Sequence, residues 1–232
     1  MNNFIYYNRL RQFGLSSTAL KIIALVIMVI DHIGCVFMTA SPYYMDIRTI
    51  GRISFPIYCF LIAEGMFYTR DIRKYAWRLG AFALISEIPY DLAFYGTPFY
   101  WHHQNVFITL FLAVFVIAVS REFSRYALDW CSYVAVAAIL IIAEFSYADY
   151  GAVGVFLILL FYYMRDDKWR CFLSVSLLML IAWWGGIQIY GAFAMSFLLL
   201  YNGKKGAGIN KYVFYGFYPV HLIILWLVQM AM

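Results

Sequence analysis

Residues 18–38 read TALKIIALVIMVIDHIGCVFM, and this stretch decides the fold class. It is an almost unbroken apolar run, and at about 1.5 Å per residue about 20 residues reach across a hydrocarbon core of about 30 Å. The first 17 residues are polar and basic. Because the run is long enough to span a bilayer, we interpret it as a transmembrane helix and not as part of a cleaved signal peptide.

The composition of the whole chain supports a membrane protein. Of 232 residues, 65% are hydrophobic, 21% aromatic and 12% charged, and the mean hydropathy is +0.77. An average soluble domain has about 25% charged residues, so these few charges exclude an ordinary soluble fold. Disorder needs low hydrophobicity, and a transmembrane β-barrel needs short alternating segments. We therefore predict an all-α fold, a polytopic integral membrane helical bundle.

The apolar runs predict about nine transmembrane helices, within a range of about 8 to 10. One membrane domain is expected over 1–232, with a short cytoplasmic segment at 1–17 and the helical bundle at 18–230. The predicted spans are 18–38, 50–68, 75–95, 105–120, 128–145, 151–164, 170–184, 186–201 and 212–230. Residues 170–201 can also be read as one long helix.

The charge distribution favours a hairpin at 170–201. With nine spans, all of the 17 Lys and Arg residues except Arg48 and Arg52 fall on the side of the N-terminus. Cytoplasmic loops collect Lys and Arg, so the N-terminus is expected inside the cell and the C-terminus outside. The net charge of +5 is explained by this topology, and no nucleic-acid partner is predicted.

Ionisable side chains within the predicted spans are the functional candidates, because a charge costs several kcal/mol in a bilayer. The alternative is a set of structural ion pairs, for example Arg52 with Glu87 or Asp91. Three prolines, Pro56, Pro89 and Pro219, fall in predicted spans and either shape the bundle or line a hydrated cavity. The candidate side chains are Asp31, His32, Arg48, Arg52, Glu64, Glu87, Asp91, Glu144, Asp149 and His221.

Other polar features favour plainer interpretations. Cys35, Cys59, Cys131 and Cys171 are scattered singly without metal-ligand spacing, so we expect apolar packing residues and no metal site. The aromatic loop YWHHQ at 100–104 is interpreted as an interfacial anchor or a lid. No nucleotide-binding or hydrolase motif is present in the sequence.

Several segments, in order over about residues 18–230, resemble the TraX family. They are Ala19–Ala24, Asp31–Gly34, Arg48–Ile57, Glu64-Gly65, Lys74-Tyr75, Arg78-Leu79, Ile85–Asp91, Gln104–Phe107, Asp149–Gly151 and Phe217–Leu222. The resemblance implies a multi-pass acetyltransferase of the bacterial cytoplasmic membrane that uses acetyl-CoA. Founding members of the family acetylate the N-terminus of F-type pilin. The acceptor of this chain could be a pilin-like N-terminus or another amine or hydroxyl, and an oligomer is compatible with the sequence.

The implied reaction gives the polar residues expected roles. Acyl transfer needs a base and a stabilised oxyanion. The catalytic candidates are His32 or His221 as base, oriented by Asp31, Glu87 or Asp91, with direct transfer or an acetyl-histidine relay. The candidates for binding the acceptor and the oxyanion are Arg52, Arg48, Glu64, Tyr218, Asn105 and Asp149. The basic loop with Arg70, Arg73, Lys74 and Arg78 could hold the phosphates of acetyl-CoA, or it could only set topology.

Two other function classes stay open from the sequence. Asp31, Glu64, Glu87 and Asp91 could carry protons in a proton-coupled small-molecule transporter, although no internal repeat is visible. A structural assembly factor without turnover would need none of the polar residues for chemistry.

Overall fold

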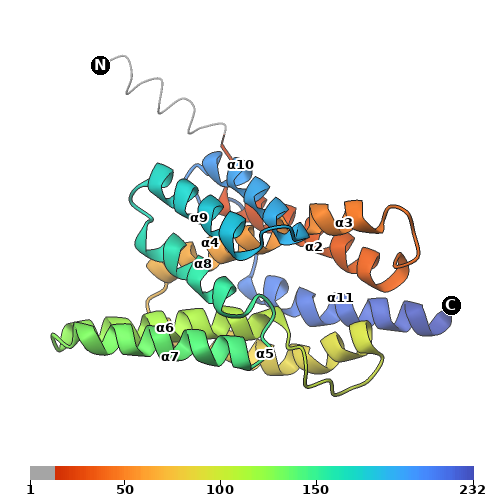
Figure 1. Cartoon of the computed structure of the whole chain (residues 1–232), viewed down its shortest axis with the longest axis horizontal. Helices are drawn as coiled ribbons and strands as arrows, with labels where there is room; N and C mark the ends of the chain where they lie inside the picture. Colours follow the sequence, from red (N-terminus) through yellow and green to blue (C-terminus); the bar gives the residue numbers. More distant parts are fainter. Residues whose placement is uncertain (1–13) are drawn as a thin grey trace, which may run out of the picture. The chain divides into compact units, whose positions relative to one another are not determined.

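The computed structural model describes residues 14–232, and this part of the chain is all-α, as predicted (Figure 1). It divides into two compact units, each described here by itself. The first consists of the chain up to Leu61 together with Asp167–Asn210. The second consists of Ile62–Asp166 together with Lys211–Met232.

The first unit is built around α2 (Ser17–Phe37). Ser16 caps this helix, because its hydroxyl accepts the Ala19 N–H at 3.2 Å. The hydroxyl of Thr18 donates to the carbonyls of Lys205 and Ala207, each at 2.8 Å, so the connection before the last helix is attached to the start of α2. The other elements of the unit are α3 (Tyr44–Gly51), the first part of α4 (Ser54–Tyr68), α9 (Lys168–Ala182), the 3-10 helix η1 (Ile187–Phe193) and α10 (Ala194–Leu199).

The second unit is a layer of antiparallel helices in which α6 (Val106–Arg125) lies between α5 (Ile72–Tyr95) and α7 (Asp129–Phe145) (Figure 1). The next helix, α8 (Gly151–Tyr163), packs on α6 and α7, and α11 (Lys211–Ala231) packs on α5.

Caps fix both ends of α5. The carboxylate of Asp71 accepts the Lys74 N–H at 3.0 Å, which holds the pKa of this exposed residue below its ordinary value. The helix ends at Gly96, whose φ of 67° is the left-handed conformation that glycine adopts without strain.

The helices fall close to the predicted runs, but nine membrane spans are not supported. In the described residues, four helical segments are long and apolar enough to cross a membrane: Ser17–Phe37, Tyr44–Tyr68, Val106–Arg125 and Lys211–Ala231. The second of these combines α3 and α4. With 13 residues, α8 is about 20 Å long at 1.5 Å per residue, and this is shorter than a hydrocarbon core of about 30 Å. α5 is long enough, but five charged residues within Ile72–Tyr95 interrupt its apolar character.

The chain between α9 and η1 breaks at 183–186, so residues 170–201 do not form one helix. Gly185 has a φ of 79°, a left-handed conformation that ends the preceding helix. η1 then packs back against α9. The predicted break is confirmed, with α9 before it and η1 and α10 after it, but neither side is long enough to be a candidate membrane span.

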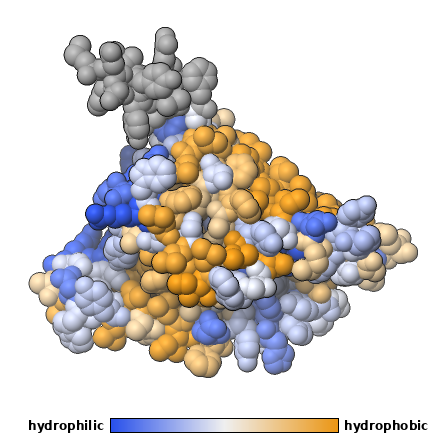
Figure 2. All heavy atoms as spheres, turned by 45° about the horizontal axis from the view of Figure 1, so that its top comes forward, coloured by the Kyte–Doolittle hydropathy of each residue, from blue (hydrophilic) through white to orange (hydrophobic). Residues whose placement is uncertain are grey.

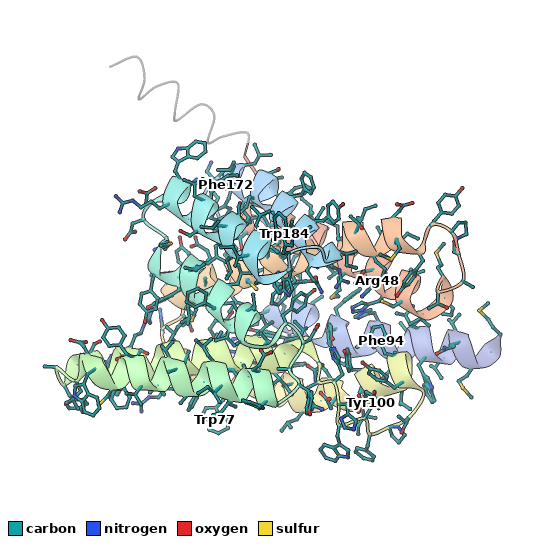
Figure 3. The ribbon with its side chains drawn as sticks, in the orientation of Figure 1. Arg48, Trp77, Phe94, Tyr100, Phe172 and Trp184 are labelled. Carbon is teal, nitrogen blue, oxygen red and sulfur yellow. The ribbon has the colours of Figure 1, made fainter. Side chains whose placement is uncertain are left out.

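Large apolar side chains are exposed on the outer faces of the helices. On α2 they follow helical spacing at Ile22, Val26 and Ile30. Trp77 on α5 is 73% exposed and extends away from its helix (Figure 3). Apolar residues also cover much of the face seen in Figure 2. Water does not favour such a surface, whereas lipid chains do.

Candidate functional site

The second unit has opposite charge at its two ends. At one end, Glu122 of α6 forms an ion pair with Arg73 at the start of α5, with 3.2 Å between the charged atoms. At the same end, Arg121 Nε of α6 donates a hydrogen bond to the Tyr162 hydroxyl of α8 at 2.5 Å. Arg165 lies at this end too. The opposite end carries Glu87, Asp91, Glu144 and Asp149, and no Lys or Arg occurs in 79–120, 126–164 or 212–232. We call these the basic end and the acidic end.

At the acidic end, Glu87 of α5 is joined to the N-terminus of α6. Its Oε2 accepts the Asn105 backbone N–H at 3.2 Å and also the Asn105 side-chain amide. The same amide donates to the Ala83 carbonyl at 2.8 Å, while its oxygen accepts the Phe107 N–H and caps α6. The amide of Asn105 is thus used within the unit, and its contacts position Glu87.

Asp91 lies one turn beyond Glu87 on the same face of α5. The residue is only 1% exposed. Its Oδ2 accepts the Tyr100 backbone N–H at 2.8 Å. Among residues 14–232, Asp91 Oδ1 and Glu87 Oε1 are buried oxygens with no hydrogen-bond partner. Such oxygens normally find a partner, so this carboxylate pair can accept hydrogens from a bound molecule or from water.

At the acidic end, the loop between α5 and α6 is hydrogen-bonded to the loop between α7 and α8. The Gln104 N–H donates to the Tyr147 carbonyl at 2.9 Å, and the Asp149 N–H donates to the Gln104 carbonyl at 3.1 Å. The hydroxyl of Thr109 on α6 donates to the Asp149 carbonyl. These bonds place Asp149 close enough to interact electrostatically with the hydroxyls of Tyr90 and Tyr218.

The structure also brings in two residues that the sequence interpretation did not select, His103 and Tyr90. The hydroxyl of Tyr90 lies 2.9 Å from His103 Nδ1. His103 interacts electrostatically with both Glu87 and Asp91. One sequence signal could have identified His103 as a site residue, because it directly precedes the family segment Gln104–Phe107. The sequence interpretation instead treats the aromatic loop as an anchor or a lid.

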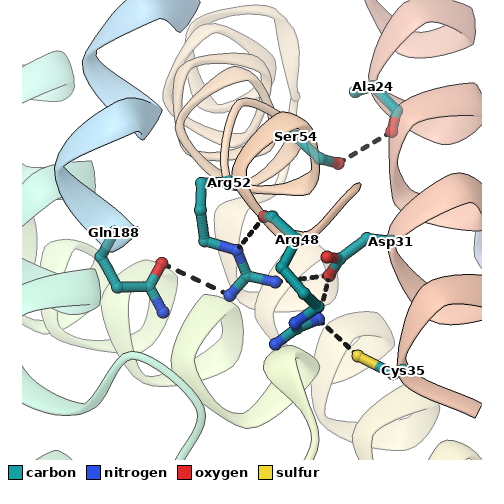
Figure 4. Close-up of polar contacts among 7 residues, drawn as sticks. All are labelled: Ala24, Asp31, Cys35, Arg48, Arg52, Ser54 and Gln188. Atoms are coloured by element: carbon teal, nitrogen blue, oxygen red, sulfur yellow. Dashed lines mark hydrogen bonds and ion pairs between the residues drawn. The ribbon is translucent and has the colours of Figure 1, made fainter. Parts of the chain in front are cut away.

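In the first unit, Asp31 joins α2 to the two arginines of the next helices (Figure 4). Its Oδ2 lies 2.8 Å from Arg48 Nη1 and 2.5 Å from Arg52 Nη2. Arg52 Nε also donates to the Arg48 carbonyl at 3.1 Å, and Arg52 Nη1 donates to Gln188 Oε1 of η1 at 3.4 Å. Both arginines therefore bind the same carboxylate oxygen. The carboxylate that they bind is Asp31.

The packing around Asp31 depends on a missing side chain at Gly51. A Cβ built on Gly51 would overlap the Asp31 carboxylate. Since Asp31 is a buried residue held by two arginines, it has little room to move.

Gly51→Ala is therefore expected to destabilise the protein by about 1–3 kcal/mol, the usual cost of overpacking. Unfolding in mixed detergent micelles would measure this loss. Gly216→Ala on α11 is the matched control, because nothing lies within 4 Å of its Cβ position. Equal stability of the two variants would contradict the expectation.

Three other predicted residues are described here within their own units. Glu64 is at the basic end, where its Oε2 lies 3.2 Å from Arg165 Nε. His221 Nδ1 lies 2.9 Å from the Phe217 carbonyl on its own helix, and its ring stacks on Phe217. His32 lies on α2 beside Asp31 in the first unit.

The four cations predicted for the phosphates of acetyl-CoA differ in exposure. Arg70, Arg73 and Lys74 are exposed, with Arg73 bonded to Glu122 and Lys74 to Asp71. Arg78 is half-buried, and its guanidinium lies 5.4 Å from the centre of the Tyr75 ring. Arg78 Nε is a buried donor without a partner in residues 14–232. This set can bind a polyanion at the basic end.

Comparison with known proteins identifies the family. Residues 16–229 match the family model described as "TraX protein". The chain belongs to the TraX family. No solved structure matches it.

Curated relatives of this TraX-family chain come from several bacteria. The "Probable fimbrial assembly protein FimC, serogroup H1" of Dichelobacter nodosus is 27% identical, with 93% of this chain and 96% of that protein covered. "Protein TraX" of Escherichia coli is 28% identical, covering 64% of this chain and 57% of that protein. "Uncharacterized protein RP591" of Rickettsia prowazekii (strain Madrid E) is 25% identical, covering 67% and 60%.

Five of the segments that suggested TraX meet at two places in the structure. In the first unit, Asp31–Gly34 and Arg48–Ile57 meet at the Asp31 ion pairs. In the second unit, Ile85–Asp91, Gln104–Phe107 and Asp149–Gly151 meet at the acidic end. Both places contain buried carboxylate oxygens without a hydrogen-bond partner in residues 14–232: Asp31 Oδ1 in the first unit, and Glu87 Oε1 and Asp91 Oδ1 at the acidic end. Asp31 is already paired with two arginines, whereas no Lys or Arg lies near Glu87 and Asp91 in the sequence, so the acidic end is the stronger candidate for a reaction site.

Proposed function

We propose that this TraX-family protein is a membrane-embedded acetyltransferase of the bacterial inner membrane. It would move an acetyl group from cytosolic acetyl-CoA to an amine or hydroxyl of an acceptor. The observation that carries this proposal is the family match over residues 16–229. The buried, unpartnered carboxylate oxygens of Glu87 and Asp91 support it, because an acceptor N–H or O–H can donate to them.

The reaction needs a proton acceptor and room for a thioester. A neutral amine or a hydroxyl attacks the acetyl carbonyl carbon, so that a new C–N or C–O bond forms and the C–S bond breaks. The acceptor loses one proton, and the thiolate of CoA gains one. The carboxylates of Glu87 and Asp91 would bind the acceptor and stabilise positive charge beside it during this exchange.

The donor would enter from the basic end. Acetyl-CoA is polyanionic, and Arg78 has a buried unpartnered N–H that can bind a phosphate or carbonyl oxygen. Arg70, Arg73 and Lys74 would raise the local concentration of the donor. We place this end in the cytoplasm, with the acidic end toward the outer face, because cytoplasmic segments collect Lys and Arg.

The relatives' names suggest the class of acceptor. The Dichelobacter nodosus relative, covered over almost its whole length, is named a probable fimbrial assembly protein. A fimbrial or pilin-like subunit with a free α-amino group therefore fits this chain. The acidic end, without Lys or Arg nearby in the sequence, would attract such a cationic group.

Purified protein in lipid nanodiscs is expected to transfer radiolabelled acetyl from acetyl-CoA to a synthetic peptide with a free α-amino group. Retention of label on the peptide after chromatography measures the transfer. Two N-formylated versions of the peptide, one with a serine and one without, distinguish the acceptor groups. Label on the formylated peptide with serine would indicate a hydroxyl acceptor, and label only on the free-amine peptide would indicate an amine acceptor.

Two results would argue against an acetyltransferase. Absence of acetyl-CoA binding and of label on every acceptor would contradict the proposal. Uphill uptake of a small molecule into proteoliposomes without any acyl-CoA would favour the proton-coupled transporter instead.

A further inference from the structure

His103 is held in place by the backbone on both of its sides. Three residues earlier, the Tyr100 N–H donates to Asp91 Oδ2 at 2.8 Å. Directly after it, the Gln104 N–H donates to the Tyr147 carbonyl at 2.9 Å, and the Asn105 N–H donates to Glu87 Oε2 at 3.2 Å. The loop therefore has a fixed course across the acidic end, and it places His103 beside the carboxylate pair.

The side chain of His103 has a defined partner for one ring nitrogen. Its Nδ1 lies 2.9 Å from the Tyr90 hydroxyl, and that hydroxyl also shares a hydrogen bond with Tyr95. A hydroxyl has one hydrogen to donate. If Tyr90 donates to Tyr95, the Tyr90 oxygen accepts the Nδ1–H of His103. This tautomer leaves the lone pair on Nε2, where it can accept a proton.

The surroundings of His103 suit an imidazole that becomes positively charged during a reaction. The side chains with which it interacts electrostatically include two carboxylates of α5, Glu87 and Asp91. The other titratable groups of the packed elements are Tyr90 and Tyr95 on α5, Tyr100 and His102 in its own loop, and Tyr147 and Asp149 in the α7–α8 loop. None of these is a Lys or Arg, so no cation among them would repel a positive charge on the ring.

We propose that His103 is the base that takes the proton from the acceptor, and that Tyr90 is the positioning residue that fixes its tautomer. This inference rests on the proposed acetyl transfer. The acceptor's N–H or O–H proton moves to His103 Nε2 as the bond to the acetyl carbon forms. When the C–S bond breaks, His103 returns the proton to the sulfur, giving CoA thiol and the acetylated acceptor.

The test compares H103Q, H102Q and Y90F in the labelled acetyl-CoA assay with the free-amine peptide. H103Q is expected to lower kcat/KM by about 10²–10⁴-fold and to abolish the acidic limb of its pH profile. H102Q is the matched control, because it changes the adjacent, exposed histidine of the same loop, and it should keep the wild-type profile. Y90F should lower kcat with little change in KM, since it removes positioning and not a contact with the acceptor.

Chemical rescue separates a proton-transfer role from a structural one. Added imidazole is expected to restore part of the activity of H103A, because it can replace the missing base. Wild-type activity and pH profile in H103Q, or a loss in H103A that imidazole does not reverse, would overturn the assignment while leaving acetyl transfer itself intact. An inactive wild-type protein would instead overturn the proposed function on which the assignment rests.

Discussion

Asp91→Asn is expected to lower the rate of acetyl transfer by about 10²–10⁴-fold with little loss of stability. Asparagine can keep the side-chain oxygen that accepts the Tyr100 N–H at 2.8 Å, so the loop retains its anchor. The substitution removes the negative charge beside Glu87 and replaces the unpartnered Oδ1 with an NH2 group, which donates hydrogen bonds and does not accept them. The initial rate with radiolabelled acetyl-CoA and the free-amine peptide measures the effect.

Glu144→Gln is the matched control for Asp91→Asn. Glu144 also lies at the acidic end, but it is exposed, and its Oε2 accepts the Ala152 N–H at 3.1 Å. The two substitutions remove the same charge from the same end of the unit. Equal rates for Asp91→Asn and wild type, or equal losses in both variants, would contradict a specific role for Asp91 and point to the general charge of the acidic end.

The helices themselves follow from local sequence. The run predicted at 18–38 forms Ser17–Phe37, and the run predicted at 75–95 forms Ile72–Tyr95. Apolar runs bounded by caps and glycine specify helices well, because each end needs a particular residue type. Pro56 is another local signal. It has no N–H to donate to the Arg52 carbonyl, and the helix is interrupted at residues 52–53, between α3 and α4.

The number of membrane spans was the part of the fold that sequence could not fix. An apolar run identifies a helix, but a short run can belong to a helix buried in protein as well as to a span. The short apolar runs of this protein are α8 and the pair of η1 and α10. Only four helical segments of the described chain have the length and hydropathy of a membrane span. The prediction of about nine transmembrane helices assumes that each apolar run spans the membrane.

Partner choice among the polar residues depends on contacts between distant segments. The sequence suggested Glu87 or Asp91 as the partner of Arg52, but the carboxylate that binds both Arg52 and Arg48 is Asp31 from the preceding helix. His103 was missed for the same reason. Its place beside Glu87 and Asp91 depends on hydrogen bonds from its loop to α5 and to the α7–α8 loop, which no local pattern encodes.

Asp31→Ala is expected to destabilise the protein by about 3–5 kcal/mol, the usual cost of removing one partner of a buried ion pair. The Asp31 and Arg52 side chains are only 9% and 6% exposed, and Arg48 shares the same carboxylate oxygen. Without Asp31, two guanidinium groups remain close together in a poorly hydrated place, so each loses its counter-charge and gains a like charge. The free energy of unfolding in mixed micelles measures the loss.

A double variant distinguishes this electrostatic cause from simple loss of packing. Arg52→Met in the Asp31→Ala background removes one of the two stranded charges and is expected to recover part of the stability. Asp46→Asn is the control, since Asp46 lies on the exposed side of α3 and should change stability little. If Arg52→Met instead adds its full cost to that of Asp31→Ala, the two residues are energetically independent. The ion pair would then not be what joins α2 to the following helices.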